Sequence, residues 1–293
     1  MKQILAISLI TTTLLSSAEL QWGHGTIDLK GGFLGLNKTI SDDIDTYSLV
    51  ENHKNFLNSK WFYSYDITVF DSKKMKQLQK NYNTGASIAN DYIKSLDGSN
   101  YITIPELEYR LAGADVGLSV GYDFLHESEN DYLGLGLYVG ISAPYIKSNK
   151  SISKTISANL AVAEYFKKSK TDFLTYKIGV GVYGQKKLTD IISIYGNSVY
   201  AYQRANIEND YAKADFDVDG SYFEVGAGLK FKVLESDIGI LSSKLYATVG
   251  WRYREWKVKD VSLNISGIST ISSPKSDMTF STNVFTIGVG YSF

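Results

Sequence analysis

The sequence predicts an all-β fold: an antiparallel up-and-down β-barrel that crosses a membrane with about ten strands, with eight and twelve as alternatives. Three observations predict it. Apolar residues recur at every second position in many segments of roughly ten residues. Beyond residue 18, no stretch is long and apolar enough for a transmembrane helix. The 293 residues include 22 tyrosines and 25 glycines but only three prolines, which suits extended, closely packed strands.

The alternation is clear in several segments. "ADVGLSVGYDF" places Val116, Leu118 and Val120 on one face and Gly117 and Ser119 on the other. "YLGLGLYVGIS", "TYKIGVGVY" and "YFEVGAGLKFKV" repeat the pattern. Because successive side chains of a strand point to opposite faces, each segment has one apolar face and one small or polar face. We expect the apolar faces to meet lipid and the others to line a narrow lumen.

The first eighteen residues, "MKQILAISLITTTLLSSA", predict a secretory signal peptide at 1–18, which leaves 19–293 as the barrel. Lys2 supplies a positive charge, an apolar run follows, and Ser16 and Ala18 are the small residues before a cut ahead of Glu19. A buried N-terminal helix is the alternative. The chain contains no cysteine, which excludes disulfides, a thiolate nucleophile and zinc–sulfur sites.

The C-terminal segment "NVFTIGVGYSF" alternates up to its last residue. One face carries Phe285, Ile287, Val289, Tyr291 and Phe293. An alternating strand that ends on phenylalanine resembles the assembly signal of bacterial outer-membrane β-barrel proteins. This resemblance implies a cell outer membrane location, contacts with outer-membrane lipid and lipopolysaccharide, and insertion by the barrel-assembly machinery.

We counted strands backward from a periplasmic C-terminus. The pattern predicts them near 280–293, 243–256, 220–233, 189–203, 172–184, 132–143, 115–125, 101–111, 60–70 and 24–35. Outward loops are then expected at 36–59, 144–171, 204–219 and 257–279, and short periplasmic connections at 126–131, 185–188 and 234–242. Residues 112–114 would form a tight outer turn. Residues 71–99 would form a long periplasmic connection of helix and loop. A short amphipathic helix is expected at 157–170.

Several charged residues fall on faces expected to line the lumen: Glu106, Glu108, Arg110, Lys177, Glu224, Arg252 and Arg254. If a hairpin closes around 234–242, Glu224 lies roughly opposite Arg252. These charges could form a pore constriction that selects ions, or internal ion pairs in a plugged barrel. We favour the plugged barrel, because about ten strands leave little open space once side chains fill it.

Two further motifs are weaker. Gly179, Gly181 and Gly184 match the G-x-G-x-x-G spacing of dinucleotide-binding loops, but a strand-like segment follows where a helix should begin. We interpret Gly179 and Gly181 as small inward residues of a curved strand. "DFDVDG" resembles the first half of a calcium loop through its three aspartates, but glycine stands where the bidentate glutamate should be. A weak divalent-cation site at Asp215, Asp217 and Asp219 remains an alternative to a solvated acidic loop.

Catalysis is not expected. The three histidines have no metal-ligand spacing: His24 and His126 fall near periplasmic strand ends, and His53 stands alone in the first outer loop. Outward aromatic residues fit girdles at the membrane interface; these are Trp61, Tyr63, Tyr65, Trp251 and Tyr253.

A net charge of −1 gives no basis for nucleic-acid binding through a basic surface. The sequence therefore favours a monomeric surface or structural barrel without cofactors. A narrow porin-like channel is the alternative, and an enzyme at the outer rim is the least favoured interpretation.

Overall fold

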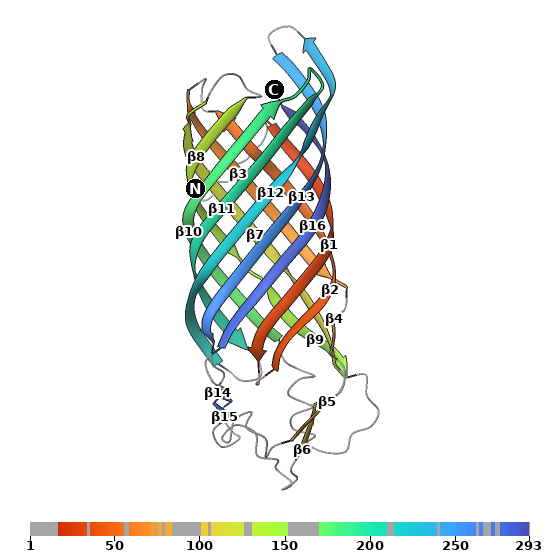
Figure 1. Ribbon diagram of the computed structural model, residues 1–293, viewed down its shortest axis with the longest axis vertical. Coiled ribbons are helices and arrows are strands. Elements are labelled where there is room, and N and C mark those ends of the chain that lie inside the picture. The colour runs from red at the N-terminus through yellow and green to blue at the C-terminus, as the bar shows by residue number, and fades with distance from the viewer. Residues whose placement is uncertain are drawn as a thin grey trace, which may run out of the picture.

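The structure is a computed structural model, and it forms a closed β-barrel (Figure 1). It describes residues 17–33, 36–55, 59–73, 75–77, 80–83, 101–104, 107–125, 131–151, 170–209, 214–238, 241–261, 264–265, 271–272 and 276–292. These residues contain strands and no helix. Among them, no helix is long and apolar enough to cross a membrane.

The wall consists of antiparallel strands of 7 to 25 residues. They are β1 (Ser17–Phe33), β2 (Leu36–Asn55), β3 (Trp61–Ser72), β7 (Leu107–Asp123), β8 (Tyr132–Ser142), β9 (Tyr145–Ser151), β10 (Lys170–Lys187), β11 (Ile192–Asn209), β12 (Ala214–Ile238), β13 (Leu241–Val261) and β16 (Ser276–Ser292). Apart from β8 and β9, each of these strands pairs with its neighbours along the chain, and β1 pairs with β16, which closes the ring. Over the described residues, the ring of the wall is closed and has no free edge strand, as a membrane-spanning sheet requires.

The ring has ten positions, because β8 and β9 together occupy one. Both pair with β7 and with β10, and a break at residues 143 and 144 separates them. β4 (Met75–Gln77) extends the line of β3 along β7. Two short ladders, β5 (Lys80–Asn83) with β6 (Tyr101–Ile104) and β14 (Asn264–Ile265) with β15 (Ile271–Ser272), lie beyond one end of the barrel (Figure 1).

We call that end the loop end, and the opposite end, where β1 begins and β16 finishes, the terminal end (Figure 1). The predicted number of ten strands agrees with the ring, but two of its members were wrong. Residues 36–59, expected as an outer loop, contain β2, and the strand expected at 101–111 is in part the start of β7. The turn expected at 112–114 is therefore continuous strand.

These two errors placed one segment at the wrong end. β3 runs from the terminal end to the loop end and β7 returns, so the connection between them belongs to the loop end rather than to the end at which β16 finishes. Within 71–99, the structure describes strand at the end of β3, at β4 and at β5, and residues 84–99 of the expected helix and loop lie outside the described residues. The helix expected at 157–170 lies outside the described residues except Lys170, which begins β10.

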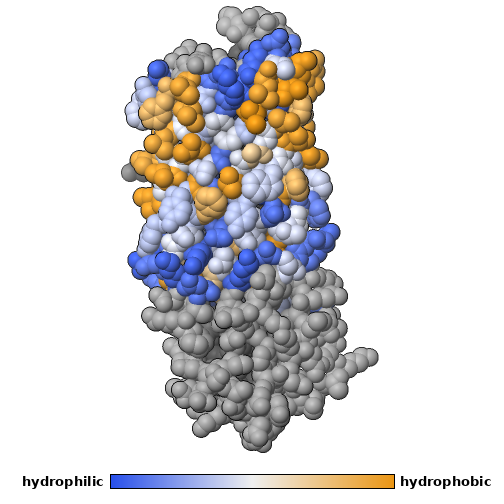
Figure 2. Space-filling model, viewed as in Figure 1, coloured by the Kyte–Doolittle hydropathy of each residue, from blue (hydrophilic) through white to orange (hydrophobic). Residues whose placement is uncertain are grey.

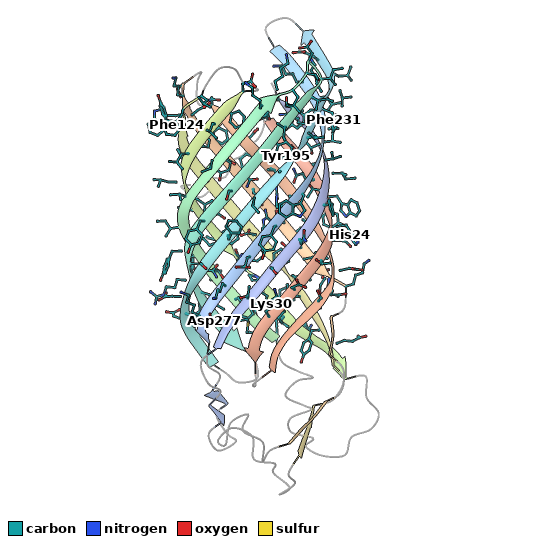
Figure 3. The ribbon with its side chains drawn as sticks, in the orientation of Figure 1. His24, Lys30, Phe124, Tyr195, Phe231 and Asp277 are labelled. Atoms are coloured by element: carbon teal, nitrogen blue, oxygen red, sulfur yellow. The ribbon has the colours of Figure 1, made fainter. Side chains whose placement is uncertain are left out.

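The wall reverses its polarity along its length. In the terminal half, apolar residues face outward, such as Leu20, Val180 and Ile287, which are 69%, 48% and 55% exposed. In the loop half, many outward residues are polar, such as Thr26, Lys30 and Arg204, whereas the inward ones include a large apolar set. Figure 2 shows the apolar surface concentrated toward the terminal end and a hydrophilic band nearer the loop end. In Figure 3, Phe124 and Phe231 lie in the first zone and Lys30 and Asp277 in the second.

The loop half has a buried apolar core, as a soluble barrel would. Phe173 and Phe280 meet edge to face with ring centroids 5.0 Å apart, and Phe70 and Trp256 lie 5.9 Å apart. Ile27, Ile44, Leu111 and Ile207 join them and are at most 1% exposed. We infer that only the terminal half has the surface of a lipid-embedded barrel, and that the loop half has the surface of a water-soluble one.

Candidate functional site: a charged layer across the lumen

A layer of charged residues crosses the lumen. It lies between the polar interior of the terminal half and the apolar core of the loop half. Its centre is Asp66 on β3, which bridges two arginines of β13. Asp66 Oδ2 accepts a hydrogen bond from Arg252 Nη1 at 2.6 Å, and its Oδ1 accepts one from Arg254 Nη2 at 2.6 Å. β2, β1 and β16 lie between β3 and β13 on this side of the ring, so both bonds cross the interior.

Glu224 on β12 forms the second acidic position. Its Oε2 accepts from Arg254 Nε at 3.0 Å and from the Tyr222 hydroxyl at 2.6 Å, while its Oε1 accepts from Asn197 Nδ2 at 2.9 Å. Because neighbours on three strands donate to this carboxylate, its charge is compensated although only 6% of the residue is exposed.

The third pair joins Lys177 on β10 to Asp115 on β7. Their side chains are 0% and 3% exposed, and Lys177 Nζ bonds to Asp115 Oδ1. The same oxygen accepts from Ser142 Oγ at 2.6 Å. Lys177 Nζ also lies 3.9 Å from the ring centroid of Tyr222, which stacks on Tyr138 at 5.9 Å.

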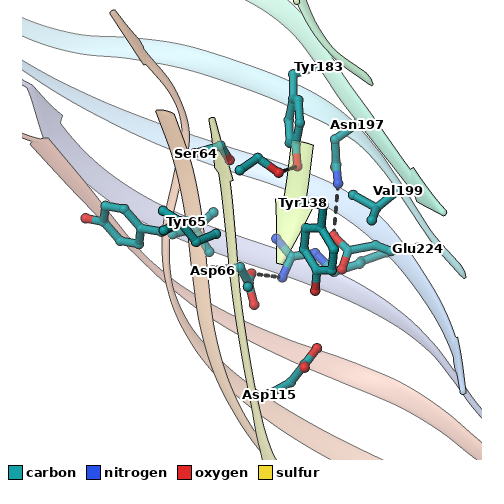
Figure 4. A pocket seen from close by; sticks show the side chains of 14 residues that line it. Ser64, Tyr65, Asp66, Asp115, Tyr138, Tyr183, Asn197, Val199 and Glu224 are labelled. Atoms are coloured by element: carbon teal, nitrogen blue, oxygen red, sulfur yellow. Dashed lines mark hydrogen bonds and ion pairs between the residues drawn. The ribbon is translucent and has the colours of Figure 1, made fainter. Parts of the chain in front are cut away.

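The layer is compact and electrically balanced. Three basic side chains, Lys177, Arg252 and Arg254, face three acidic ones, Asp66, Asp115 and Glu224. The cavity among them has a volume of about 20 Å³, enough for about one water. Figure 4 shows Asp66, Asp115, Tyr138, Asn197 and Glu224 gathered around it. Among the described residues, each of these six charges has a partner of opposite charge.

The four inward predictions on β10, β12 and β13 fall in this layer, but their partners differ from those expected. Glu224 stands opposite Arg254 in the strand register, and Arg252 stands opposite Gly226. A register shift between Lys232 and Leu234 contributes to the difference. Arg252 instead pairs with Asp66 from across the barrel.

The lumen prediction for Arg110 on β7 was wrong. Arg110 faces outward, its side chain is 46% exposed, and it pairs with Asp71 of the neighbouring strand. Glu108 lies on the same outward face of β7 by the alternation of the strand, and Glu106 lies outside the described residues. The inward residue of this strand at the charged layer is Asp115.

Sequence reasoning missed three members of the layer: Asp66, Asp115 and Tyr222. The alternation contained the signal for two of them. In β3, Phe62, Ser64 and Asp66 share the inward face with Thr68. In β7, Asp115 begins the small, inward face that was identified through Gly117 and Ser119.

The glycines of the dinucleotide-like motif lie in β10, and β11 follows, so no helix begins there. Gly179 and Gly181 alternate with outward valines on the inner face. A Cβ on Gly181 would lie 2.7 Å from the Tyr183 ring, so the inward tyrosine requires glycine there. This agrees with the interpretation of small inward residues in a curved strand.

The acidic motif was expected in a loop but lies in β12, with its aspartates on alternate positions. Asp217 accepts from Arg204 Nη2 at 2.7 Å and from Asn206 Nδ2 at 3.4 Å, and Asp219 accepts from the Tyr202 hydroxyl. The side chain of Asp215 lies outside the described residues. Across the described part of the chain, no group of three histidine, cysteine or acidic residues could hold a metal ion.

The histidines also lie at other positions than the sequence predicted. His24 lies within β1 on the outer wall, where its Nδ1 is 2.8 Å from Asp45 Oδ1. His53 belongs to β2 rather than to an outer loop, and His126 lies outside the described residues. The last strand presents Phe285, Ile287, Val289 and Tyr291 outward, with Phe285 73% exposed, whereas Phe293 lies outside the described residues.

Comparison with known proteins gives no family. No family model matches the chain, and no curated protein matches it in sequence. The solved structures similar to it include the outer membrane protease OmpT from Escherichia coli, at 12% identity and TM-score 0.45, covering 94% of this chain and 97% of that one. They also include the attachment invasion locus protein Ail of Yersinia pestis, at 10% identity and TM-score 0.30, covering 95% and 99%.

The outer membrane protein OprG from Pseudomonas aeruginosa is similar at 11% identity and TM-score 0.27, covering 95% and 97%. These neighbours are bacterial outer-membrane β-barrel proteins. At such scores, they do not indicate what this chain does.

Proposed function

We propose that this chain is an integral outer-membrane β-barrel with a closed lumen, which anchors a water-exposed stalk and holds its loop end away from the membrane as a surface structure. The apolar outer wall of the terminal half supports the membrane anchor. The polar outer wall and apolar core of the loop half support a stalk that projects into water.

The charged layer is the observation that supports the proposal of a closed lumen. Every charge in this layer has an opposite partner within hydrogen-bonding distance, and the cavity among these residues has a volume of about 20 Å³. A conducting pore needs a continuous water path, and its lining charges must be free to interact with passing ions. The apolar core beyond the layer is a second barrier to ions. This function includes no catalytic step and no cofactor.

The proposed contacts in the membrane follow from the polarity of the outer wall. The apolar outer wall of the terminal half is the contact for outer-membrane lipid, and the hydrophilic band nearer the loop end is the contact for lipopolysaccharide headgroups. The apolar face of β16 is the segment proposed to be read by the barrel-assembly machinery, after removal of a signal peptide at 1–18. The protein is proposed to act as a monomer.

Current through a planar lipid bilayer tests the closed lumen. We expect the folded wild-type protein to give no unitary current. A triple variant, Asp66→Ala, Arg252→Ala and Arg254→Ala, removes the centre of the layer and also takes Arg254 from Glu224. The matched control, Asp71→Ala with Arg110→Ala, removes an exposed pair of the outer wall. Heat-modifiable gel mobility confirms folding in each case.

A stable current from the wild-type protein would refute the closed lumen and favour the narrow channel. Flotation with lipid vesicles tests the membrane anchor separately. A purified mature chain that remains dissolved without detergent would refute the anchor.

A further inference from the structure

The outer wall has an open groove near the terminal end, outside the charged layer. Its volume is about 460 Å³, and its lining includes Leu133 on β8, Gly184 and Lys186 on β10, and Ile194 and Gly196 on β11. Leu133 and Ile194 are outward residues, 42% and 44% exposed. These outward side chains give the groove an apolar outer face, and its lining also includes Tyr132, Gln185 and Tyr195 from the inward positions of the same strands.

The floor of the groove exists because two glycines face each other. Gly184 of β10 is in register with Gly196 of β11, and both occupy outward positions. A Cβ on Gly184 would find its nearest neighbours at 3.5 and 3.6 Å, which is ordinary contact. Packing within the wall therefore does not require glycine at 184, and the missing side chain leaves outward space open.

A charged pair lies at the rim. Lys186 Nζ is 3.6 Å from Asp131 Oδ1, and the Lys186 side chain is 64% exposed. The same Asp131 oxygen accepts a hydrogen bond from the Lys187 backbone N–H at 2.7 Å, which fixes the carboxylate in place. A fixed acidic group and an exposed basic group thus stand side by side above an apolar groove.

We propose that this groove binds one phospholipid with a zwitterionic headgroup that carries a primary ammonium, such as phosphatidylethanolamine. An acyl chain fills the groove over Gly184 and Gly196. The phosphate accepts from Lys186, and the ammonium donates to Asp131. A phosphatidylcholine headgroup has no N–H to donate to Asp131, and phosphatidylglycerol brings no positive charge to it.

This proposal rests on the proposed membrane anchor, because the groove meets lipid only if the terminal half is embedded. The lipid-site proposal is more specific than the anchor proposal, because it names one binding site and one class of headgroup. The apolar wall alone would hold lipids without distinguishing headgroups.

Native mass spectrometry of the full mature chain tests the site, with phosphatidylethanolamine, phosphatidylglycerol and phosphatidylcholine of identical acyl chains as probes. We expect one phosphatidylethanolamine to remain bound at collision energies that strip the other two. Gly184→Leu fills the groove and displaces several methylene groups, so the bound fraction should fall roughly tenfold. Asp131→Asn should abolish the preference over phosphatidylcholine.

The control variant is Ala247→Leu, which enlarges another outward residue of the terminal half, on β13, and should leave binding unchanged. Equal retention of all three lipids by the wild type, or equal retention of phosphatidylethanolamine by wild type and Gly184→Leu, would overturn the site. Vesicle flotation of the same samples separates the two proposals: if the proteins float but show no headgroup preference, the site fails and the anchor stands.

Discussion

Arg252 Nη1 lies 2.6 Å from Asp66 Oδ2 across the interior of the barrel, and this contact ties β13 to β3 although three strands separate them in the ring. Both side chains are largely buried, at 9% and 17% exposure. Asp66 also accepts from Arg254, so one carboxylate compensates two guanidinium groups. Asp66 is therefore the acidic residue through which β3 takes part in the layer.

We predict that Asp66→Ala lowers the free energy of unfolding by about 3–5 kcal/mol, because it removes the acidic partner of the buried Arg252 and one of the two hydrogen-bonded carboxylates of Arg254. Urea unfolding in detergent micelles, followed by tryptophan fluorescence, measures the loss. Asp71→Ala, on the outward face of the same strand, is the matched control. Its pair with Arg110 is exposed, so a loss below about 1 kcal/mol is expected. Equal losses for the two variants would contradict a structural role for the layer.

The apolar core of the loop half should contribute to stability as a soluble core does. Trp256 is 3% exposed, packs against Phe70 and Tyr222, and donates its indole N–H to Ser142 Oγ at 3.0 Å. We expect Trp256→Ala to cost about 3–5 kcal/mol in the same unfolding assay. Trp256→Phe keeps much of the packing and should cost less. If both cost nothing, the stalk is held together by its hydrogen-bonded wall alone.

The polarity reversal predicts where a new outward charge is tolerated. Val180→Arg places a charge on the apolar wall and should destabilise the inserted barrel by about 2–4 kcal/mol if this residue lies near the bilayer midplane. Thr26→Arg places the same charge on the polar stalk, where it should be nearly neutral. Unfolding in lipid vesicles measures both. A larger cost at residue 26 than at residue 180 would mean that the membrane belt has been assigned to the wrong half.

Calcium should not stabilise the barrel through the acidic residues of β12. Asp217 is already paired with Arg204, and Asp219 accepts from Tyr202, so a cation would have to displace these partners. We expect the same melting temperature with calcium and with a chelator. A calcium-dependent rise that disappears in Asp217→Asn would restore the cation site as an alternative.

The sequence alone determined the barrel and much of its wall. Alternation identified β10, β12 and β16 and assigned Lys177, Glu224 and Arg252 to the lumen, because side-chain direction in a strand follows from position alone. It missed β2, since "KTISDDIDTYSL" carries acidic residues at outward positions of the stalk, where a membrane strand would be apolar. It split β7 for a related reason, because apolar residues move from the outer to the inner face along that strand.

Only the tertiary structure decided which charges meet. Strand register set Glu224 against Arg254, and closure of the ring brought Asp66 to Arg252 from the far side. Neither relationship can be read from local sequence, because contacts across a lumen depend on strand number, stagger and bulges together. The pattern of single strands thus specified a barrel wall, while ring closure determined that its interior is filled and charge-balanced.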